Sequence, residues 1–459
     1  MRWLWILLVL LATAVAAQQY PVLRLTAARP VSWLPPGATW GIDFVNQRSW
    51  PQPRAQLGLF TPTTAGLRFA ETAAGRLEPA VASTAQVTDL GYASSLAATN
   101  LIVQSQAFST ATWTATGASA TDNAAAAPNG AQTASTLIED GSTGQHKITL
   151  TTALTTTASQ PLSASIYIKA SGRLQGRLQL ADATGSNGVS ADFDTTATTY
   201  AGAITAGTVL GVGTLLTSYI QPLNPGFVPG QASWYRVVIQ GTVGTSTNAA
   251  LTLFLASAVG TISYAGNGSS GMAIWGAQIN DNTNNGIRSY APTAGTTQAT
   301  RGDQMSALNP TQFQQQIQGT IYVEWLERGP ISAAPARYLF LLSGTVSNYL
   351  LLQLSAANKL VCTVNNAGTI TSMITSGSLT PNTIYRAAYS YAPGAHACTY
   401  NGFVNVNTAT VGTPGLPVTA VGIGQGLNAA NNSDDVIRTV AWSPQAQGGD
   451  VIQKWVLSK

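Results

Sequence analysis

The sequence predicts a mostly β protein, and three observations support that prediction. Only 8% of the 459 residues are charged, against about 25% in ordinary globular domains. Solubility must therefore rest on Thr, Ser, Asn, Gln and Gly, which suit strands and turns. Many short runs such as Ser163–Ile168 alternate between two faces and end at Gly, Asn or Pro, as antiparallel strands do. No long amphipathic helical pattern follows the first twenty residues. We therefore expect antiparallel β-sandwiches.

The length of 459 residues indicates about three domains at about 150 residues each. Two apolar segments that each carry a Trp, Asn100–Trp113 and Gly271–Ile279, bracket the central region as the first and last strands of one sandwich would. A short helical tail is expected at Gln445–Leu457. The expected segments are a hydrophobic signal-like segment (1–17), a Pro-rich attachment region with short strands (18–99), a first β-sandwich (100–300) and a second β-sandwich (301–459).

Residues 1–17 have the pattern of a secretory signal peptide. Arg2 is the basic start, Leu4–Leu11 the apolar core, and small residues precede Gln18. The apolar span is shorter than the about 20 residues that a membrane-spanning helix needs. An uncleaved helix buried in an assembly is the alternative interpretation.

The Pro-rich region 18–99 contains three tryptophans, so it is more than a flexible linker. Prolines at this density exclude central strands and long helices. We expect Trp33, Trp40 and Trp50 to pack on a neighbouring protein and to form the attachment surface.

Several chemistries lack support in the sequence. The net charge is +4, but the basic residues are scattered, whereas nucleic-acid binders concentrate them on one face; we expect no nucleic-acid partner. Neither His146 nor His396 has a motif partner for a Ser-His-Asp arrangement. Glu139-Asp140, or Glu324 with Glu327, could supply a glycosidase pair, but the odd spacing of Glu324 and Glu327 places them on opposite faces of a strand. We predict no enzymatic activity and no cofactor.

A calcium site and a disulfide are left open by the residue pattern. Asp182, Asn187, Asp192 and Asp194 could offer oxygen ligands, as could Asp434-Asp435 near Asn431-Asn432, but no spacing matches a 12-residue calcium loop, and solvated loops are the favoured interpretation. Cys362 and Cys398 lie in strand-like runs. A disulfide fits if those strands are neighbours, and two buried free thiols fit equally, since spacing alone does not place the Cα atoms.

The central region resembles a domain of bacteriophage head-spike and tail-fibre proteins. The matching residues are Asn100-Leu101, Ser105–Phe108, Trp113, Pro128–Gly130, Leu137–Asp140, Gly144–His146, Ser165–Ala170, Trp234–Arg236, Tyr264–Gly268, Trp275–Gln278 and Ser289–Thr293. The resemblance implies a jelly-roll, carbohydrate-binding sandwich. The last region is similar to concanavalin/laminin-G-like lectin domains through Gly319–Trp325, Tyr400–Gly402 and Arg438–Trp442. The signal-like segment departs from the pattern, because virion proteins are normally assembled in the cytoplasm.

The resemblance implies a virion appendage, either a head spike or fibre or a tail fibre, that binds host-surface polysaccharide. Other virion proteins would hold its N-terminal region, and a homotrimer is expected by analogy. A secreted or cell-surface bacterial lectin or adhesin is the alternative, and a polysaccharide depolymerase is a second one. Sugar rings stack on aromatic side chains. Trp113, Trp234 and Trp275 are expected in the core, and the ligand-binding candidates are Tyr167, Tyr235, Tyr264, Tyr338, Tyr349 and Tyr400.

Overall fold

Strands form almost all of the regular structure in this computed structural model, and the prediction of a mostly β chain with antiparallel sheets is confirmed. The structure describes residues 33–50, 67–80, 85–94, 98–151, 154–197, 203–205, 207–223, 234–281, 289–300, 305–308, 313, 317–328, 336–355, 357–374, 377–380, 382–401, 407–410, 412, 418–425 and 435–457. The signal-like segment 1–17 lies outside these ranges. None of the helices within them has the length and apolarity needed to cross a membrane.

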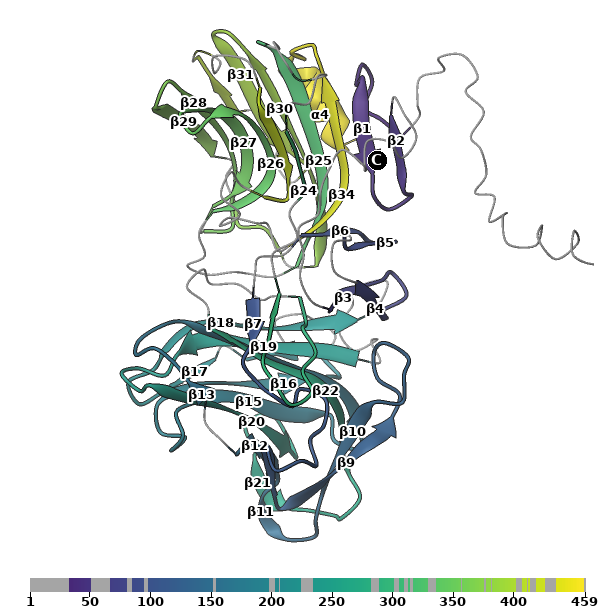
Figure 1. Cartoon of the computed structure of the whole chain (residues 1–459), viewed down its shortest axis with the longest axis vertical. Coiled ribbons are helices and arrows are strands. Elements are labelled where there is room, and N and C mark those ends of the chain that lie inside the picture. Colours follow the sequence, from purple (N-terminus) through teal and green to yellow (C-terminus); the bar gives the residue numbers. More distant parts are fainter. Residues whose placement is uncertain are drawn as a thin grey trace, which may run out of the picture.

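The central sandwich occupies the lower half of Figure 1 and packs two sheets face to face. Its core is mostly aliphatic, with Ile166, Leu178, Val237 and Leu253 all at most 1% exposed. One sheet has the order β18 (Thr214–Leu223), β19 (Trp234–Thr242), β14 (Leu162–Ser171), β22 (Gly271–Asp281), β10 (Ala134–Glu139) and β9 (Ala118–Ala125). The other has the order β17 (Thr208–Leu210), β16 (Gly188–Asp194), β15 (Gln175–Ala181), β20 (Asn248–Ala256), β12 (Lys147–Leu150) and β8 (Trp113–Thr116), with β13 (Leu154–Thr155) on β20. A small pair, β11 (Thr143–Gln145) and β21 (Ser263–Ala265), closes one end.

The two ends of the central region meet, as the sequence predicts. β7 (Ala98–Asn100) pairs with β23 (Gln298–Thr300). The Leu101 amide donates to the carbonyl of Ile279 at 2.9 Å, next to a fully buried Asn100 side chain. β22 is nevertheless an inner strand of its sheet, because β14 and β10 flank it on both sides.

The second sandwich, in the upper half of Figure 1, also has two sheets. The larger has the order β2 (Arg48–Trp50), β1 (Trp40–Asp43), β34 (Val436–Ser443), β25 (Gly319–Glu327), β30 (Thr383–Ala392), β31 (Ala395–Tyr400) and β32 (Asn407–Ala409), with β6 (Gly91–Ala93) on β34 and β5 (Val87–Thr88) on β6. The smaller has the order β24 (Met305–Leu308), β33 (Ala420–Ile423), β26 (Arg337–Thr345), β27 (Asn348–Leu354), β28 (Leu360–Asn366) and β29 (Thr369–Ile374). The expected helical tail forms as α4 (Gly449–Leu457), whose Ile452 and Val456 cover the outer face of β30 at Ala388.

Two N-terminal strands complete the larger sheet, which corrects the expected attachment role of Trp40. β1 pairs with β34 in the register Trp40↔Trp442, and Trp40 is 1% exposed in the sandwich core beside Phe313. It therefore cannot form a surface for another protein. The proline argument failed locally because β1 and β2 lie in a stretch without proline, between Pro36 and Pro51. Trp50 is half-buried, and it packs with the mostly buried Trp33 in a cluster beside α4.

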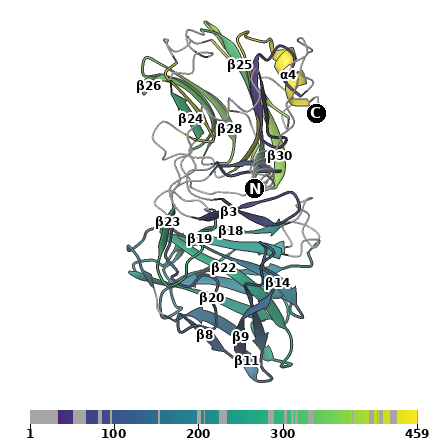
Figure 2. The ribbon, with the colours of Figure 1, turned by 45° about the vertical axis from the view of Figure 1, so that its right-hand side comes forward.

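Residues 67–80 and 85–94 lie between the two sandwiches, as Figure 2 shows. The hairpin of β3 (Arg68–Glu71) and β4 (Leu77–Ala80) packs on the central sandwich through Phe69, which contacts Trp275 and Tyr290. Glu71 forms an ion pair with Arg328, which directly follows β25, and burial lowers the pKa of Arg328 to about 9. The junction encloses a cavity of about 70 Å³, well below the about 300 Å³ of small-ligand sites. We therefore interpret this cavity as a gap within a structural junction and not as a ligand site.

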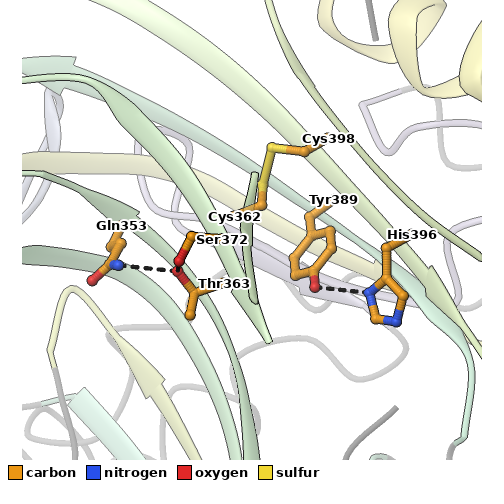
Figure 3. The surroundings of a disulfide bond; sticks show 7 residues. All are labelled: Gln353, Cys362, Thr363, Ser372, Tyr389, His396 and Cys398. Carbon is orange, nitrogen blue, oxygen red and sulfur yellow. Dashed lines mark hydrogen bonds between the residues drawn. A yellow bond between two sulfur atoms is a disulfide. The ribbon is translucent and has the colours of Figure 1, made fainter. Parts of the chain in front are cut away.

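A disulfide joins Cys362 to Cys398, which settles the two alternatives left open by the sequence. Cys362 lies on β28 and Cys398 on β31, so the bond crosses the core between the two sheets instead of linking neighbouring strands (Figure 3). The two Cα atoms are 6.2 Å apart, within the usual range for a bridge. Sheet-to-sheet distance was not available from the sequence, and it is what brings the cysteines together.

Replacing both cysteines by alanine should lower the free energy of unfolding by about 3 kcal/mol, because the bridge restricts a loop of 36 residues in the unfolded chain. Guanidinium denaturation of the wild type and of the double variant measures the change. Adding reductant should destabilise the wild type and leave the variant unaffected. Equal denaturation midpoints for wild type and variant would contradict the prediction.

Candidate functional site

Three of the six candidate tyrosines are buried, which corrects their expected role in ligand contact. Tyr167 is 3% exposed on the outer face of its sheet, where the β3–β4 hairpin and its neighbours cover it. Tyr235 is 2% exposed and donates its hydroxyl to the Thr195 carbonyl. Tyr400 is 5% exposed in the second core. Strand alternation cannot reveal that a distant segment covers an outer face.

The other three tyrosines are partly exposed but lie apart. Tyr264 is on β21 in the central sandwich, whereas Tyr338 and Tyr349 are on β26 and β27 in the second one. Their role in ligand binding stays a prediction. Trp113 fills the central core as expected, while Trp234 and Trp275 are buried in the separate cluster with Phe69 and Tyr290.

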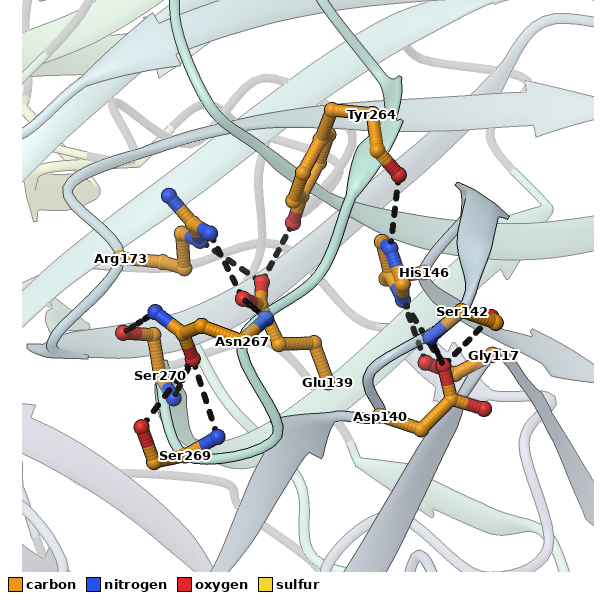
Figure 4. A network of polar contacts seen from close by, with 10 residues as sticks. All are labelled: Gly117, Glu139, Asp140, Ser142, His146, Arg173, Tyr264, Asn267, Ser269 and Ser270. Carbon is orange, nitrogen blue, oxygen red and sulfur yellow. Dashed lines mark hydrogen bonds and ion pairs between the residues drawn. The ribbon is translucent and has the colours of Figure 1, made fainter.

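Tyr264 belongs to a polar network around Glu139 at the end of the central sandwich (Figure 4). The Glu139 carboxylate is 0% exposed and accepts four hydrogen bonds, from Arg173 Nε and Nη2, Tyr264 Oη and the Asn267 amide. Burial by itself would raise the pKa of Glu139, but these hydrogen bonds outweigh it and lower the pKa to about 2. All of the carboxylate's hydrogen-bonding capacity is therefore used in joining β21 to the loops that contain Arg173 and Asn267, and Glu139 is not available as a glycosidase acid.

This network should make stability depend on pH in one window. A carboxyl group whose pKa falls from 4.5 to about 2 on folding contributes stability above pH 4.5, and that contribution is lost as the pH falls toward 2. Glu139→Gln should therefore flatten the pH dependence of the free energy of unfolding between pH 4.5 and 2. The exposed Glu78 provides the control variant, Glu78→Gln, which should keep the wild-type slope. An unchanged slope in Glu139→Gln would contradict the prediction.

The remaining candidates for chemistry have structural partners. Glu324 and Glu327 lie on opposite faces of β25, as predicted, since Glu327 bonds to Trp325 and Arg337 on the core side. His146 has its ring nitrogens at the carbonyls of Gly117 (2.5 Å) and Tyr264 (3.2 Å), and His396 bonds to Tyr389. Asp182 accepts from Thr184, Ser186 and Asn187, Asp192 accepts from Arg177, and Asp194 accepts from Thr196. Within the described ranges no three His, Cys, Asp or Glu side chains gather as a metal site. Asn431, Asn432 and Asp434 lie outside those ranges.

A groove of about 290 Å³ opens on the outer face of the larger sheet of the second sandwich. Its floor is one row of residues across five adjacent strands. The register pairs Arg48 with Asp43, Asp43 with Thr439, Thr439 with Glu324, and Glu324 with Arg386. The lining consists of Trp33, Asp43, Val45, Asn46, Arg48, Glu324, Arg386, Arg438 and Thr439. We call this the Trp33 groove.

Ion pairs hold the charged side chains of the groove in fixed positions. Glu324 accepts from Arg386 Nε at 2.8 Å and from Arg438 Nε at 3.0 Å, one arginine on each oxygen. Asp43 accepts from the amide and side chain of Asn46 and from Arg48 Nε. The Arg48 guanidinium lies 4.9 Å from the centre of the Trp33 ring, within range of a cation–π contact. The groove thus offers preorganised donors and acceptors, and the mostly buried Trp33 ring supports Arg48 from below.

The sequence does not predict this groove, because its residues come from the segment 33–48 and from β25, β30 and β34, which are far apart in the chain. Trp33 was expected in an attachment surface, and Glu324 was considered only as a catalytic acid. Arg438 joins the row because a β-bulge between Glu324 and Trp325 shifts the register of β34. A local pattern of alternation carries no signal for such a bulge.

Comparisons with known proteins give likenesses of fold only. No protein-family model and no curated protein matches the chain. The CBM40 of the Ruminococcus gnavus IT-sialidase, bound to α2,3-sialyllactose, is 11% identical over 30% of this chain and 82% of that chain, with a TM-score of 0.24. The binding domain of botulinum neurotoxin serotype D is 13% identical over 34% of this chain and 41% of that chain, with a TM-score of 0.27. A structure from work on cell entry of botulinum neurotoxin type C, which depends on two ganglioside molecules, is 15% identical over 34% and 40%, with a TM-score of 0.27.

Proposed function

We propose that the chain is a glycan-binding protein without catalytic activity and that the Trp33 groove is its binding site. The observation that carries this proposal is the convergence of three arginines, two carboxylates and an asparagine in one groove on the outer face of a sheet. Ion pairs and hydrogen bonds hold these polar groups in place beside the mostly buried Trp33.

The chemistry of the groove suits a sugar. A pyranose presents apolar C–H faces that stack on an aromatic ring and hydroxyl groups that need fixed donors and acceptors. The ion pairs around Glu324 and Asp43 fix such groups before a ligand arrives, which lowers the entropic cost of binding. The volume of about 290 Å³ is at the lower end of ligand pockets, so the groove fits a sugar unit and not a long chain segment.

Binding of the full-length chain to a panel of bacterial surface polysaccharides tests the proposal. Trp33→Ala and Glu324→Gln should each weaken binding about tenfold or more, because they remove the ring that supports Arg48 and the group that orients two arginines. Ile370→Ala, at a position 60% exposed on β29 of the other sheet, is the matched control and should bind like the wild type. Tyr349→Ala, on the outer face of that sheet, tests one of the remaining candidate tyrosines there. Loss of binding in Tyr349→Ala alone would show that the binding site lies on that sheet and not in the Trp33 groove. Release of oligosaccharides during incubation would contradict the absence of catalysis.

A finer part of the proposal is that the chain is a virion appendage that binds host-surface polysaccharide. Its support is the resemblance of the central residues to phage head-spike and tail-fibre proteins. Other virion proteins would hold the N-terminal region. A homotrimer would raise avidity by about 10²–10⁴ when its sites reach one surface together. Detection of the chain in purified particles, and a mass of three chains in light scattering, would be the expected results; a free monomer absent from particles would contradict them.

A secreted bacterial lectin or adhesin is the second candidate, and the Cys362–Cys398 disulfide favours it. Structural disulfides form and persist in oxidising compartments, and the signal-like segment is consistent with export. Mass spectrometry of the N-terminus distinguishes the two candidates. A mature chain that starts at Gln18 supports the secreted protein, whereas an intact N-terminus in particles supports the appendage.

A further inference from the structure

The charges of the Trp33 groove identify a ligand class, an inference that rests on the proposed glycan binding. Three guanidinium groups, of Arg48, Arg386 and Arg438, line the groove together with two carboxylates. This leaves one positive charge in excess at neutral pH, in a chain where only 8% of residues are charged. Binding of a neutral sugar would not require this excess of positive charge in the groove.

The arginines are held by contacts that leave the excess charge within the groove. Glu324 takes one Nε–H from each of Arg386 and Arg438, so a single carboxylate serves two cations. Asp43 is already bonded to Asn46 as well as to Arg48. The Arg48 side chain keeps 46% of its surface exposed, while Asp43 is 6% exposed. The Arg48 guanidinium therefore lies at the open side of the groove, and the Asp43 carboxylate lies beneath it.

We propose that the Trp33 groove binds the carboxylate of an acidic sugar, with Arg48 as its main contact and Arg438 and Arg386 behind it. A planar guanidinium matches a carboxylate through two parallel hydrogen bonds. Trp33 is 9% exposed, and its ring lies under the Arg48 guanidinium, so it holds that guanidinium in position. The groove is thus specific for uronic or similar carboxylated units at the surface of a polysaccharide.

Oligogalacturonate and the same oligomer with every carboxyl methyl-esterified form a matched pair of probes. Calorimetry with the full-length chain should show a preference for the acid of about tenfold or more, since a hydrogen bond to a charged group adds that much. The preference should shrink as salt rises from 50 to 500 mM, because ions screen exposed charges. Dextran sulfate tests whether charge alone suffices, and it should bind more weakly than the acid.

Two variants and one control complete the test. Arg48→Gln and Arg438→Gln should each reduce the preference for the acid by about tenfold. If one of the two variants does not fold, the other still tests the inference. Lys169→Gln removes one positive charge from an exposed position on the central sandwich and should keep the preference. If Lys169→Gln loses it too, net charge and not the groove is responsible, and the inference falls.

The outcomes separate the two proposals. Equal binding of acid and ester, or binding of neutral saccharides alone, overturns the carboxylate and leaves glycan binding in place. Dextran sulfate binding as tightly as the acid also overturns the carboxylate. Failure to bind any saccharide in the polysaccharide panel overturns both.

Discussion

Replacing Asn100 by alanine should lower the free energy of unfolding of the central sandwich by about 4 kcal/mol. The side chain is 0% exposed and uses its full hydrogen-bonding capacity. Its amide donates to the carbonyls of Ala277 and Ala291, and its oxygen accepts from the amides of Ile102 and Ile279. Truncation leaves four buried backbone groups without a partner, at about 1 kcal/mol or more each. Guanidinium denaturation measures the loss.

Two further variants sharpen this prediction. Asn129 is half-buried and accepts one hydrogen bond, from the Ala131 amide, so Asn129→Ala should cost less than about 1 kcal/mol. Asn100→Asp keeps an acceptor but sets a carboxylate oxygen against two carbonyls, and it should be about as destabilising as alanine at pH 7. Its deficit relative to the wild type should shrink at acidic pH, where the protonated group can donate again. A loss in Asn100→Ala no greater than in Asn129→Ala would show that the Asn100 bonds do not hold the sandwich.

Replacing Arg337 by leucine should lower the free energy of unfolding of the second sandwich by about 4 kcal/mol. Arg337 on β26 donates to Asp435 at 2.8 Å and to Glu327 at 3.0 Å, and it also bonds to Asn358. The side chains of Glu327 and Asp435 are both 0% exposed. Removing the cation leaves two buried carboxylates without their main counter-ion, which typically costs about 3–5 kcal/mol. Equilibrium denaturation at pH 7 checks the value.

Arg177 provides the control, because it too makes two hydrogen bonds to carboxylate oxygens, here both of Asp192, through Nε and Nη2. Its pair with Asp192 is more exposed, at 24% and 13% of the two side chains, so Arg177→Leu should cost only about 1 kcal/mol. Adding Glu327→Leu to Arg337→Leu should restore part of the loss, because one buried charge then disappears with its partner. If Arg337→Leu costs no more than Arg177→Leu, burial is not what makes the Arg337 pairs important.

Less of the candidate site than of the fold could be predicted from the sequence. Glu324 and Glu327 could be assigned to opposite faces of a strand, since alternation is local. The disulfide could not be decided, because Cys362 and Cys398 meet across two sheets. Residue type alone could not separate the candidate tyrosines: the β3–β4 hairpin covers Tyr167, whereas Tyr235 and Tyr400 face the cores of their sandwiches. The Trp33 groove needed five strands in register before its residues had any relation to one another.

The amino-acid sequence by itself determined the β class, the helical tail and the closure of the central sandwich at Asn100 and Ile279. Those features follow from composition, alternation and short-range patterns, which act within a strand or a turn. The tertiary structure alone decided that β1 joins β34, that the two cysteines face each other, and that Trp33 and three arginines line one groove. Strand neighbours and covered faces are set by contacts between residues hundreds of positions apart, and the pattern within a single strand does not encode its partner.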